Sequence, residues 1–460
     1  MRDSADAPDS GEISHEAPPG NGAASGAASG AASSSVPGPG ELDALRRRTQ
    51  AVLIASQILG GLGVSTAVAL AAVLAKDIGG SEAVAGLAST SSVIGTALLS
   101  LPFASLMAAR GRRVGLTLAY VVAAVGGAVV VVAAALANFP LLLIGMAAFG
   151  AGNSANLQAR FAAADLAEPA RRGRAISTVV WATTIGAVLG PNIAAPAGRS
   201  TSGLGIPAAA GPFVWGTGVF LVSAVLVHLL LRPDPLLTAR ALAEAEAGGE
   251  GGGGAGERSL KAALATVRDS ARARLALVTI AGSHTVMVSV MVMTPVDLGG
   301  HGADIALIGL VISGHVAGMY AFSPVMGWLA DRLGRLSVIL LGVALLAVAT
   351  ALAGTANGHH AQSAAGLFLL GLGWSAGLVA GSALLTDSVP QPARAAVQGL
   401  SDLIMNAAAG VGGALSGLVV SGAGYGWLNA GAAALLVPVA ALTLLSLTRR
   451  NRARSHEPNV

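Results

Sequence analysis

Twelve long apolar segments constrain the fold of this chain more than any other feature. Each has about 20 or more residues, the length that an α-helix needs to cross the hydrocarbon core of a bilayer. Only 11% of the 460 residues are charged, against about 25% in an average soluble domain. The sequence therefore predicts an all-α integral membrane protein with twelve transmembrane helices, at about 51–75, 83–108, 114–137, 140–165, 175–197, 212–231, 274–298, 305–330, 336–356, 361–386, 395–421 and 426–447.

The basic residues predict how these helices are oriented. When successive loops are assigned to alternate sides of the membrane, Lys76 and Arg199 fall on one side and Arg160 falls within a span, which leaves 24 of the 27 Lys and Arg on the side of both termini. Basic residues accumulate in cytoplasmic loops, so we expect both termini in the cytoplasm. This distribution explains the net charge of +4 without a nucleic-acid partner. The use of 25 Arg against 2 Lys favours a high-GC genome. We expect the protein in the inner membrane of a bacterium.

Composition divides the chain into five parts. Residues 1–45 are acidic and then rich in Gly, Ala and Ser, which predicts a disordered cytoplasmic tail. A Gly-rich run at 247–254 predicts a flexible connection between the sixth and seventh spans. We therefore expect six-helix bundles at 46–231 and 274–448, a cytoplasmic linker at 232–273 that ends in a short basic surface helix, and a cytoplasmic tail at 449–460.

The two predicted bundles share short sequence markers at one constant spacing. Gly111 and Gly334 are 223 positions apart, and the Pro-Ala-Arg triplets at 169–171 and 392–394 have the same offset. All four markers fall in predicted cytoplasmic loops. The equal offsets favour two parallel repeats related by an axis along the membrane normal.

A charged turn between two spans carries the most specific pattern. Residues 327–335 read Gly-Trp-Leu-Ala-Asp-Arg-Leu-Gly-Arg, which resembles the loop signature of the major facilitator superfamily of transporters; the alternative is an ordinary basic turn at a helix end. The resemblance implies two six-helix bundles that rock about a central site. It also implies a gating role for this loop and for its counterpart in the first half: Gly327, Asp331, Arg332, Gly334, Arg335, Gly111, Arg112 and Arg113.

The loop of the first half departs from this signature at one position, because Ala108 stands where the Asp is expected. In the family, the Asp is thought to latch against helix starts of the opposite half. A carboxylate near a helix N-terminus is stabilising by about 0.3–1 kcal/mol. Here only Asp331 can make such a contact, near Arg174 at the start of the fifth span, so we expect an asymmetric gate.

The fifth span contains a second pattern with a functional meaning. Gly186, Gly190 and Pro191 resemble the Gly-x-x-x-Gly-Pro-x-x-Gly-Gly signature of drug/proton antiporters within the superfamily, with Ala194 and Ala195 in place of its last glycines. This resemblance implies export in exchange for protons. The alternative is simple helix packing, because pairs of small residues four positions apart let helices approach closely.

Polar residues within the spans are the candidates for a substrate cavity or for proton coupling. Asn153, Asn156 and Arg160 follow each other at i, i+3 and i+7 and therefore lie on one helical face. A charged residue inside a membrane usually faces a cavity or a partner, although Arg160 could instead extend to the cytoplasmic surface. The remaining candidates are Gln57, Trp181, His284, Met287, His315, Trp374, Asp402 and Asn406.

Three of these candidates can titrate: Asp402, His284 and His315. Packing is the alternative for each His, and Asp402 could simply pair with Arg112 or Arg113. His284 and Met287 share a helical face, which suits an adaptable apolar cavity.

One pattern raises the possibility of an enzyme. Residues 373–377 match the Gly-x-Ser-x-Gly pattern around hydrolase nucleophiles, but that chemistry needs a strand-to-helix turn, whereas Ser375 falls in mid-span. The sequence contains no phosphate-binding loop and no His-Glu-x-x-His motif, so we expect no enzymatic activity, no cofactor and no metal.

The family resemblance implies a monomeric secondary transporter in the lipid bilayer that exports a small, fairly apolar compound by alternating access, with protons as the coupling ion. Uptake of a metabolite by symport or facilitated diffusion is the alternative. A membrane-embedded hydrolase, or a sensor that has kept the fold, is a more distant one.

Overall fold

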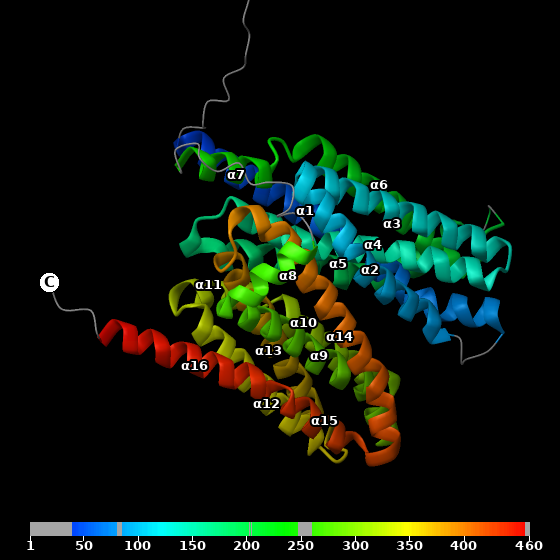
Figure 1. Ribbon diagram of the computed structural model, residues 1–460. Coiled ribbons are helices and arrows are strands. Elements are labelled where there is room, and N and C mark those ends of the chain that lie inside the picture. Colours follow the sequence, from blue (N-terminus) through cyan, green and yellow to red (C-terminus); the bar gives the residue numbers. More distant parts are fainter. Residues whose placement is uncertain (1–38, 81–84, 202, 204, 247–259, 456–460) are drawn as a thin grey trace, which may run out of the picture. The chain divides into compact units, whose positions relative to one another are not determined.

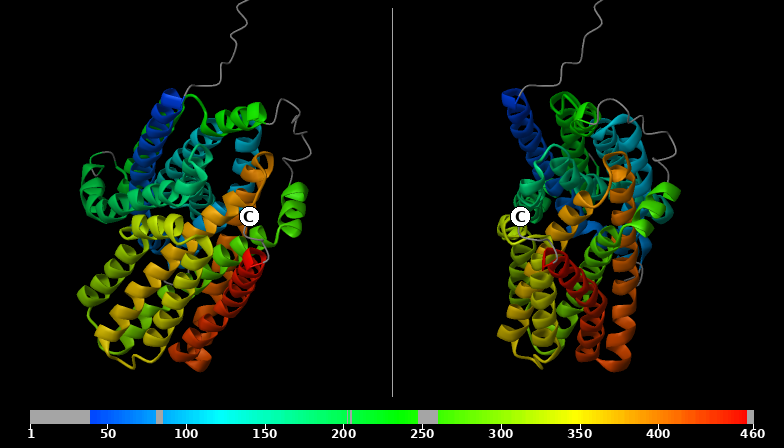
Figure 2. Two further views of the ribbon diagram at one scale, coloured as in Figure 1. Left: turned by 90° about the vertical axis from the view of Figure 1, so that its left-hand side faces the viewer. Right: turned by 60° about the vertical axis from the view of Figure 1, so that its left-hand side comes forward.

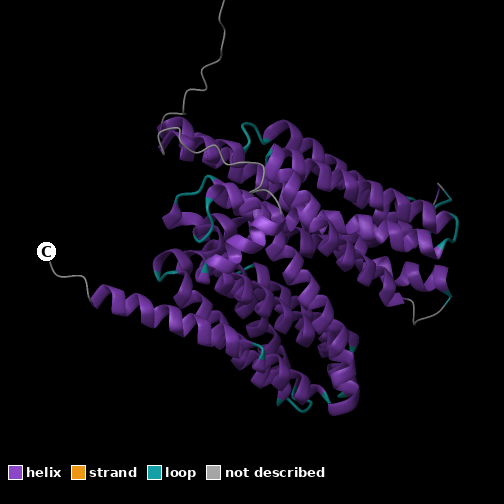
Figure 3. Ribbon diagram, in the orientation of Figure 1, coloured by secondary structure: helices purple, strands orange, loops and turns teal. Residues whose placement is uncertain are grey.

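The computed structural model describes residues 39–80, 85–201, 203, 205–246 and 260–455, and within these ranges it is built from helices without a strand (Figures 1 and 3). Nine helical segments of this described part are long and apolar enough to cross a membrane. The prediction of an all-α membrane protein is therefore confirmed.

Among the described residues, six long helices form the first half of the protein and eight helices form the second half. The first half comprises α1 (Pro39–Gly79), α2 (Ala85–Arg110), α3 (Arg112–Ala135), α4 (Phe139–Asp165), α5 (Arg172–Ser200) and α6 (Gly211–Leu230). The second half comprises α9 (Ala271–Gly300), α10 (Ile305–Tyr320), α11 (Ser323–Arg332), α12 (Arg335–Gly354), α13 (His360–Asp387), α14 (Arg394–Ala423), α15 (Tyr425–Ala434) and α16 (Leu436–Ser455). Between the halves lie α7 (Pro235–Glu246) and α8 (Leu260–Asp269).

The second half has more helices because two of its predicted spans are interrupted. The eighth span is divided into α10 and α11, with Pro324 in the first turn of α11. The twelfth is divided into α15 and α16, and Pro438 follows the break. Proline lacks the backbone N–H that would continue the preceding helix, so each break follows from the sequence.

The two halves repeat one packing scheme. In the first half α1 packs on α5, α2 on α4, and α3 on both α4 and α6; in the second half α9 packs on α14, α10 on α13, and α12 on both α13 and α15 (Figure 2). The turns that begin α3 and α12 are also equivalent, because Gly111 and Gly334 have φ angles of 90° and 91°. Such positive angles favour glycine, which has no Cβ to clash with the backbone. The predicted two repeats are thus confirmed.

The halves contact each other mainly through α2 with α14 and through α5 with α10 and α11. These contacts include the helix ends next to four connections: the turns at Gly111 and Gly334, η2 (Pro169–Arg171) and η6 (Gln391–Ala393). We call this the basic end of the protein. The linker helix α7 packs there against α4 and η6, and α8 packs against α9 and α14.

Several predicted boundaries fall close to the ends of the described residues. The predicted tail at 1–45 lies outside the described residues up to position 38, whereas 39–45 form the first turns of α1 and are not a disordered segment. The Gly-rich run at 247–254 lies outside the described residues, and so do 456–460. Residues 449–455, which were assigned to the second tail, continue α16.

Candidate functional site

Asp331 lies at the start of α5 in the opposite half of the protein. Its Oδ1 and Oδ2 atoms accept hydrogen bonds from the backbone amides of Gly173 and Arg174, each at 2.9 Å. Its carboxylate also pairs with Arg335 at 2.7 Å, and Arg174 Nε lies 3.6 Å away. The first amides of a helix lack partners within the helix. A buried carboxylate therefore caps α5 from across the interface.

Gly327 allows α11 to approach α5 closely. A Cβ atom at this position would lie 2.6 Å from the Cβ of Ser177 and 2.5 Å from the backbone oxygen of Gly173. Ser323 adds a hydrogen bond of 3.0 Å to the backbone oxygen of Ser177. The glycine of the loop pattern is thus required by the contact between the halves. Of the remaining loop residues, Arg332 stacks on the exposed Trp328, and Gly334 forms the turn.

The equivalent contact of the first half lacks a carboxylate. Ala108 is buried in a small apolar cluster with Leu236 of α7 and Ala395 of α14. Arg240 of α7 donates a hydrogen bond of 2.7 Å to the backbone oxygen of Ala108 and one of 3.5 Å to that of Pro392 in η6. The linker helix therefore bridges the two halves at the position where the sequence pattern has lost its Asp.

Two further linker contacts involve the predicted loop residues of the first half. Asp234 caps the start of α7 through Leu236 N and accepts a hydrogen bond of 2.7 Å from Arg113 N. Gly111 precedes this contact, and a Cβ there would clash with the Asp234 carboxylate. The loop of the first half is thus held by α7.

Arg160 and Asp402 form an ion pair between α4 and α14. Arg160 Nη2 lies 2.6 Å from Asp402 Oδ1, and the two residues are 1% and 0% exposed. Arg160 Nε also donates to Ser382 Oγ at 3.2 Å, and the guanidinium lies over the ring of Phe161. The alternative that Arg160 extends to the surface is wrong, because a buried carboxylate on the opposite half holds it.

A second buried arginine continues this network toward the basic end. Arg112 pairs with Asp165 at 2.8 Å and donates to Gln158 Oε1 at 3.0 Å, while Gln158 Nε2 donates to Asp402 at 2.7 Å. Arg112 also donates to Gln398 Oε1 of α14. The alternative that Asp402 simply pairs with Arg112 or Arg113 is therefore wrong, because Asp402 pairs with Arg160 and Arg112 pairs with Asp165.

A cavity of about 140 Å³ lies beside the Arg160–Asp402 pair and is lined by both halves. Seven of the predicted cavity candidates line it: Gln57, Asn153, Asn156, Arg160, His284, Trp374 and Asn406. Aromatic and sulfur-containing side chains complete much of the wall: Met319, Tyr320 and Met405. The cavity thus combines polar groups from the first half with mostly apolar groups from the second half.

Hydrogen bonds fix most polar groups around the cavity. Trp374 Nε1 donates to His284 Nδ1 at 2.8 Å, and the ring of Trp374 packs edge-on against Tyr320 with centroids 5.5 Å apart. Tyr120 donates to Asn156 Oδ1 at 3.0 Å. Within the described part of the chain, Gln57 Oε1 and Arg160 Nη1 are buried without a hydrogen-bond partner. These two atoms are therefore an acceptor and a cationic donor beside the cavity that have no partner within the protein.

Four candidates do not line this cavity. Trp181 is 37% exposed, Met287 packs in the core of the second half, and His315 is fully buried with Nδ1 2.8 Å from the backbone oxygen of Leu367. Asp402 pairs with Arg160 but is not among the lining residues. Conversely, Thr183 and Tyr320 line the cavity but were not among the candidates. Both flank predicted features, since Thr183 lies two residues after Trp181 and Tyr320 ends α10 at the helix break.

The antiporter-like residues of α5 pack against α1. A Cβ at Gly186 would lie 2.5 Å from Leu62 N, and one at Gly190 would lie 2.8 Å from the Cβ of Ser65. Pro191 lies within α5. Close packing within the first half thus explains both glycines. Ser375 lies in the middle of α13 and is fully buried, so it has no strand-to-helix turn.

Comparison with known proteins agrees with this architecture. The sequence profile of the Major Facilitator Superfamily matches residues 53–299 and 275–459. The uncharacterised MFS-type transporter YddS of Bacillus subtilis (strain 168) is 35% identical over 405 residues, which cover 87% of this chain and 92% of that protein. The riboflavin transporter RfnT of Brucella anthropi is 28% identical over 406 residues, covering 88% and 96%.

A solved structure gives the same result for the fold. The outward-facing bacterial homologue of the iron transporter ferroportin superposes with a TM-score of 0.67 at 16% identity, covering 86% of this chain and 98% of that one. The profile match and the 35% identity to YddS are the findings that decide the family. This chain therefore belongs to the Major Facilitator Superfamily of membrane transporters.

Proposed function

We propose that this protein is a proton-coupled transporter that exports a small, flat organic compound by alternating access. The observation that carries the proposal is the cavity beside the Arg160–Asp402 pair, because both halves line it and the ion pair crosses between them. Movement of one half against the other necessarily changes this site. A binding site that is divided in this way is what alternating access requires.

The lining of the cavity supports a substrate that is mainly apolar but has a polar edge. Trp374, Tyr320 and two methionines supply flat, polarisable surfaces. Gln57 Oε1 can accept a hydrogen bond and Arg160 Nη1 can donate one, and both are buried. A fused aromatic ring system with neighbouring N–H and C=O groups would satisfy these atoms. Riboflavin, the compound in the name of the related riboflavin transporter RfnT, has a ring system of this kind.

Asp402 is our candidate for the proton-carrying group. As a carboxylate it compensates the buried charge of Arg160, and separating such a pair is costly in a region without water. Protonation of Asp402 removes the attraction and lowers the cost of moving α14 away from α4. The deprotonated form thus favours the arrangement with a closed basic end, and the protonated form favours its opening.

We further propose that the basic end faces the cytoplasm, so that this arrangement is outward-facing. The concentration of Lys and Arg on the side of both termini supports this orientation. Asp331 then acts as a latch, because its contacts with α5 are available only while the basic end is closed. The monomer contains both halves of the site, which supports function without a partner chain.

Direction depends on which protonation state binds the substrate. A neutral or cationic compound that donates a hydrogen bond binds better while Asp402 is charged, so that substrate and proton alternate and export results. The sequence feature that favours export is the antiporter-like pattern of α5. An anionic compound would bind Arg160 better after Asp402 is protonated, which gives uptake by symport. This alternative is favoured by the unpartnered Arg160 Nη1.

Reconstitution into liposomes tests these proposals. A panel of flat heteroaromatic compounds that includes riboflavin is offered while a pH gradient is imposed in either direction, with Asp402→Asn as the uncoupled variant and Ser375→Ala as the control. Antiport predicts accumulation in vesicles with an acidic interior, and symport predicts it with an acidic exterior. If the flux of a transported panel compound changes neither with the pH gradient nor with the substitution Asp402→Asn, proton coupling is refuted. Loss of activity in Ser375→Ala alone would instead favour the hydrolase alternative.

A further inference from the structure

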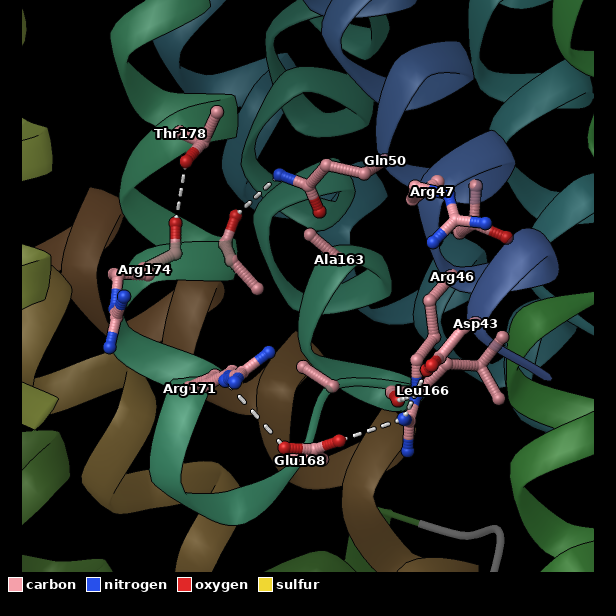
Figure 4. Close-up of a pocket in the computed structure, with 13 residues that line it drawn as sticks. Asp43, Arg46, Arg47, Gln50, Ala163, Leu166, Glu168, Arg171, Arg174 and Thr178 are labelled. Atoms are coloured by element: carbon pink, nitrogen blue, oxygen red, sulfur yellow. Dashed lines mark hydrogen bonds and ion pairs between the residues drawn. The ribbon is translucent and has the colours of Figure 1, made fainter. Parts of the chain in front are cut away.

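Another pocket lies at the basic end, where the start of α1 meets the end of α4 and the start of α5 (Figure 4). Its volume is about 430 Å³, and it shares no residue with the central cavity. Its apolar floor comprises Ala163 of α4 and the two residues that follow this helix, Leu166 and Ala167. Six of its thirteen lining residues are charged: Asp43, Arg46, Arg47, Glu168, Arg171 and Arg174. We call it the α1–α5 groove.

Arg46 compensates both acidic groups of this groove. Its Nη1 lies 3.0 Å from Asp43 and 2.9 Å from Glu168, and its Nε donates to the backbone oxygen of Leu166 at 2.9 Å. With its side chain 29% exposed, Arg46 acts as a brace between α1 and the end of α4. Among the residues that line the α1–α5 groove, four arginines outnumber two carboxylates, so positive charge is in excess, although Arg174 also contacts a carboxylate outside the groove, that of Asp331.

Arg47 and Arg171 are exposed sources of this excess charge. Both residues are exposed, and the nearest carboxylate oxygen to Arg171 is that of Glu168 at 3.7 Å. Figure 4 shows their guanidinium groups on opposite sides of the α1–α5 groove. Gln50, which donates to the backbone oxygen of Ala175 at 3.0 Å, also lines the groove. A ligand bound between Arg47 and Arg171 would therefore contact hydrogen-bond donors of both α1 and η2.

We propose that the α1–α5 groove binds a phosphate group, either the headgroup of an anionic phospholipid or a free phosphate ester. Guanidinium groups bind phosphate oxygens through paired hydrogen bonds, and several arginines can share one phosphate. Basic pockets between transmembrane helices on the cytoplasmic side suit anionic headgroups. The apolar floor, with Ala163, Leu166 and Ala167, suits the carbon atoms next to such a headgroup. This inference is independent of the transported substrate.

A binding experiment with purified full-length protein in a zwitterionic detergent tests the proposal. The probe is a short-chain fluorescent phosphatidylglycerol, and its affinity is measured by fluorescence anisotropy. The double variant Arg47→Gln/Arg171→Gln is expected to bind about tenfold more weakly, because two charge-assisted donors are lost. Arg174 is left intact because it also contacts Asp331 at the closed interface.

Two further variants separate a specific site from a general charge effect. Arg272→Gln removes an exposed arginine at the start of α9 and should leave the affinity unchanged. Glu168→Gln removes a carboxylate from the α1–α5 groove and should strengthen binding severalfold. Equal losses in the double variant and in Arg272→Gln would overturn the proposal. Weaker binding by Glu168→Gln, in protein with an unchanged melting temperature, would also contradict it.

Competition then identifies the source of the phosphate group. If glycerol 3-phosphate displaces the probe only at concentrations far above those of unlabelled phosphatidylglycerol, the site is a lipid site. If both compete at similar concentrations, it is a site for soluble phosphate esters. Either result supports phosphate recognition. Failure of both to displace the probe from the wild-type protein would show that the probe binds through its fluorophore and not through its phosphate group, and the proposal would be wrong.

Discussion

Arg160 of α4 and Asp402 of α14 form a buried ion pair of 2.6 Å that joins the two halves of the protein. The pair borders the central cavity on one side and reaches the Arg112–Asp165 pair on the other, through Gln158. A charge change at Asp402 therefore affects both the substrate site and the contact between the halves. This arrangement is the physical basis for the proposed coupling.

The first prediction concerns the energetic coupling of this pair. Arg160→Gln and Asp402→Asn each leave one buried charge without its partner, which typically destabilises a protein by about 3–5 kcal/mol. The double variant loses both charges and should be less destabilised than the sum of the single variants by about 0.5–3 kcal/mol. Unfolding of the purified variants in detergent measures this difference. Strictly additive losses would show that the two side chains do not interact.

A second prediction tests Asp331 as a latch. Asp331→Asn keeps the size of the side chain but weakens two hydrogen bonds to α5 and the pair with Arg335, so the closed basic end should lose about 1 kcal/mol, or roughly a factor of five in population. The chain contains no Cys, so Ser177→Cys provides a single label in the buried α5–α11 contact. Maleimide labelling of this Cys should be several times faster in the Asp331→Asn background.

The matched control for Asp331 is Asp304, which caps the start of α10 through Leu307 N at 2.7 Å. Asp304→Asn should leave the labelling rate of Ser177→Cys unchanged, because this cap does not join the halves. Equal acceleration by both variants would mean that the label reports general loosening and not a latch.

A third prediction concerns the linker helix. Arg240→Ala removes the hydrogen bonds from α7 to Ala108 and Pro392, which bridge the halves on the side where the Asp is missing. We expect faster labelling of Ser100→Cys, a buried position on α2 next to Gly399 of α14. Labelling of Ser177→Cys should change less. A larger increase in labelling at Ser177→Cys than at Ser100→Cys would show that α7 does not stabilise the contact between α2 and α14.

The fold could be predicted from the sequence because membrane-spanning helices depend on length and apolar composition alone. The polar face of α4 was predictable for a similar reason, since Asn153, Asn156 and Arg160 follow the helical period and all three line the cavity. The partner of Arg160 was not predictable. It depends on how α4 and α14 are aligned across the interface, and Asp402 is 242 residues away.

Trp181 illustrates a second limit of the sequence. Its position on α5 is one helical turn or less from Val180 and Thr183, which line the cavity, yet Trp181 is 37% exposed. Neighbouring residues of a helix point about 100° apart, and in a membrane both the lipid side and the cavity side accept an aromatic residue. The same ambiguity applies to His315 and His284, which composition alone does not distinguish.

A fourth prediction uses the close approach at Gly327. Alanine usually stabilises a helix by about 1 kcal/mol relative to glycine. At Gly327, however, the added methyl group would meet Ser177 and the backbone of Gly173, so Gly327→Ala should disfavour the closed basic end. Gly309→Ala in α10 is the control, because no atom lies within 4 Å of the added carbon there. Ser177→Cys labelling should accelerate only for Gly327→Ala; unchanged rates would contradict the close packing.

The last prediction distinguishes the two intramembrane histidines. His284 accepts the hydrogen bond that orients Trp374 in the cavity wall. In His284→Leu the indole N–H is left buried without its acceptor, at a cost of about 1–3 kcal/mol. We therefore expect the KM of the transported compound to rise by about tenfold or more. His315→Leu changes a residue that contacts Leu367 and does not line the cavity, so the KM should remain close to that of the wild type.

A second substitution separates this positioning effect from loss of an imidazole contact with the substrate. In His284→Leu/Trp374→Phe the unpaired N–H is absent, because phenylalanine has no donor, while a flat ring still lines the cavity. If His284 acts by orienting Trp374, adding Trp374→Phe should restore part of the affinity lost in His284→Leu. A further rise in KM would instead mean that both side chains contact the substrate independently.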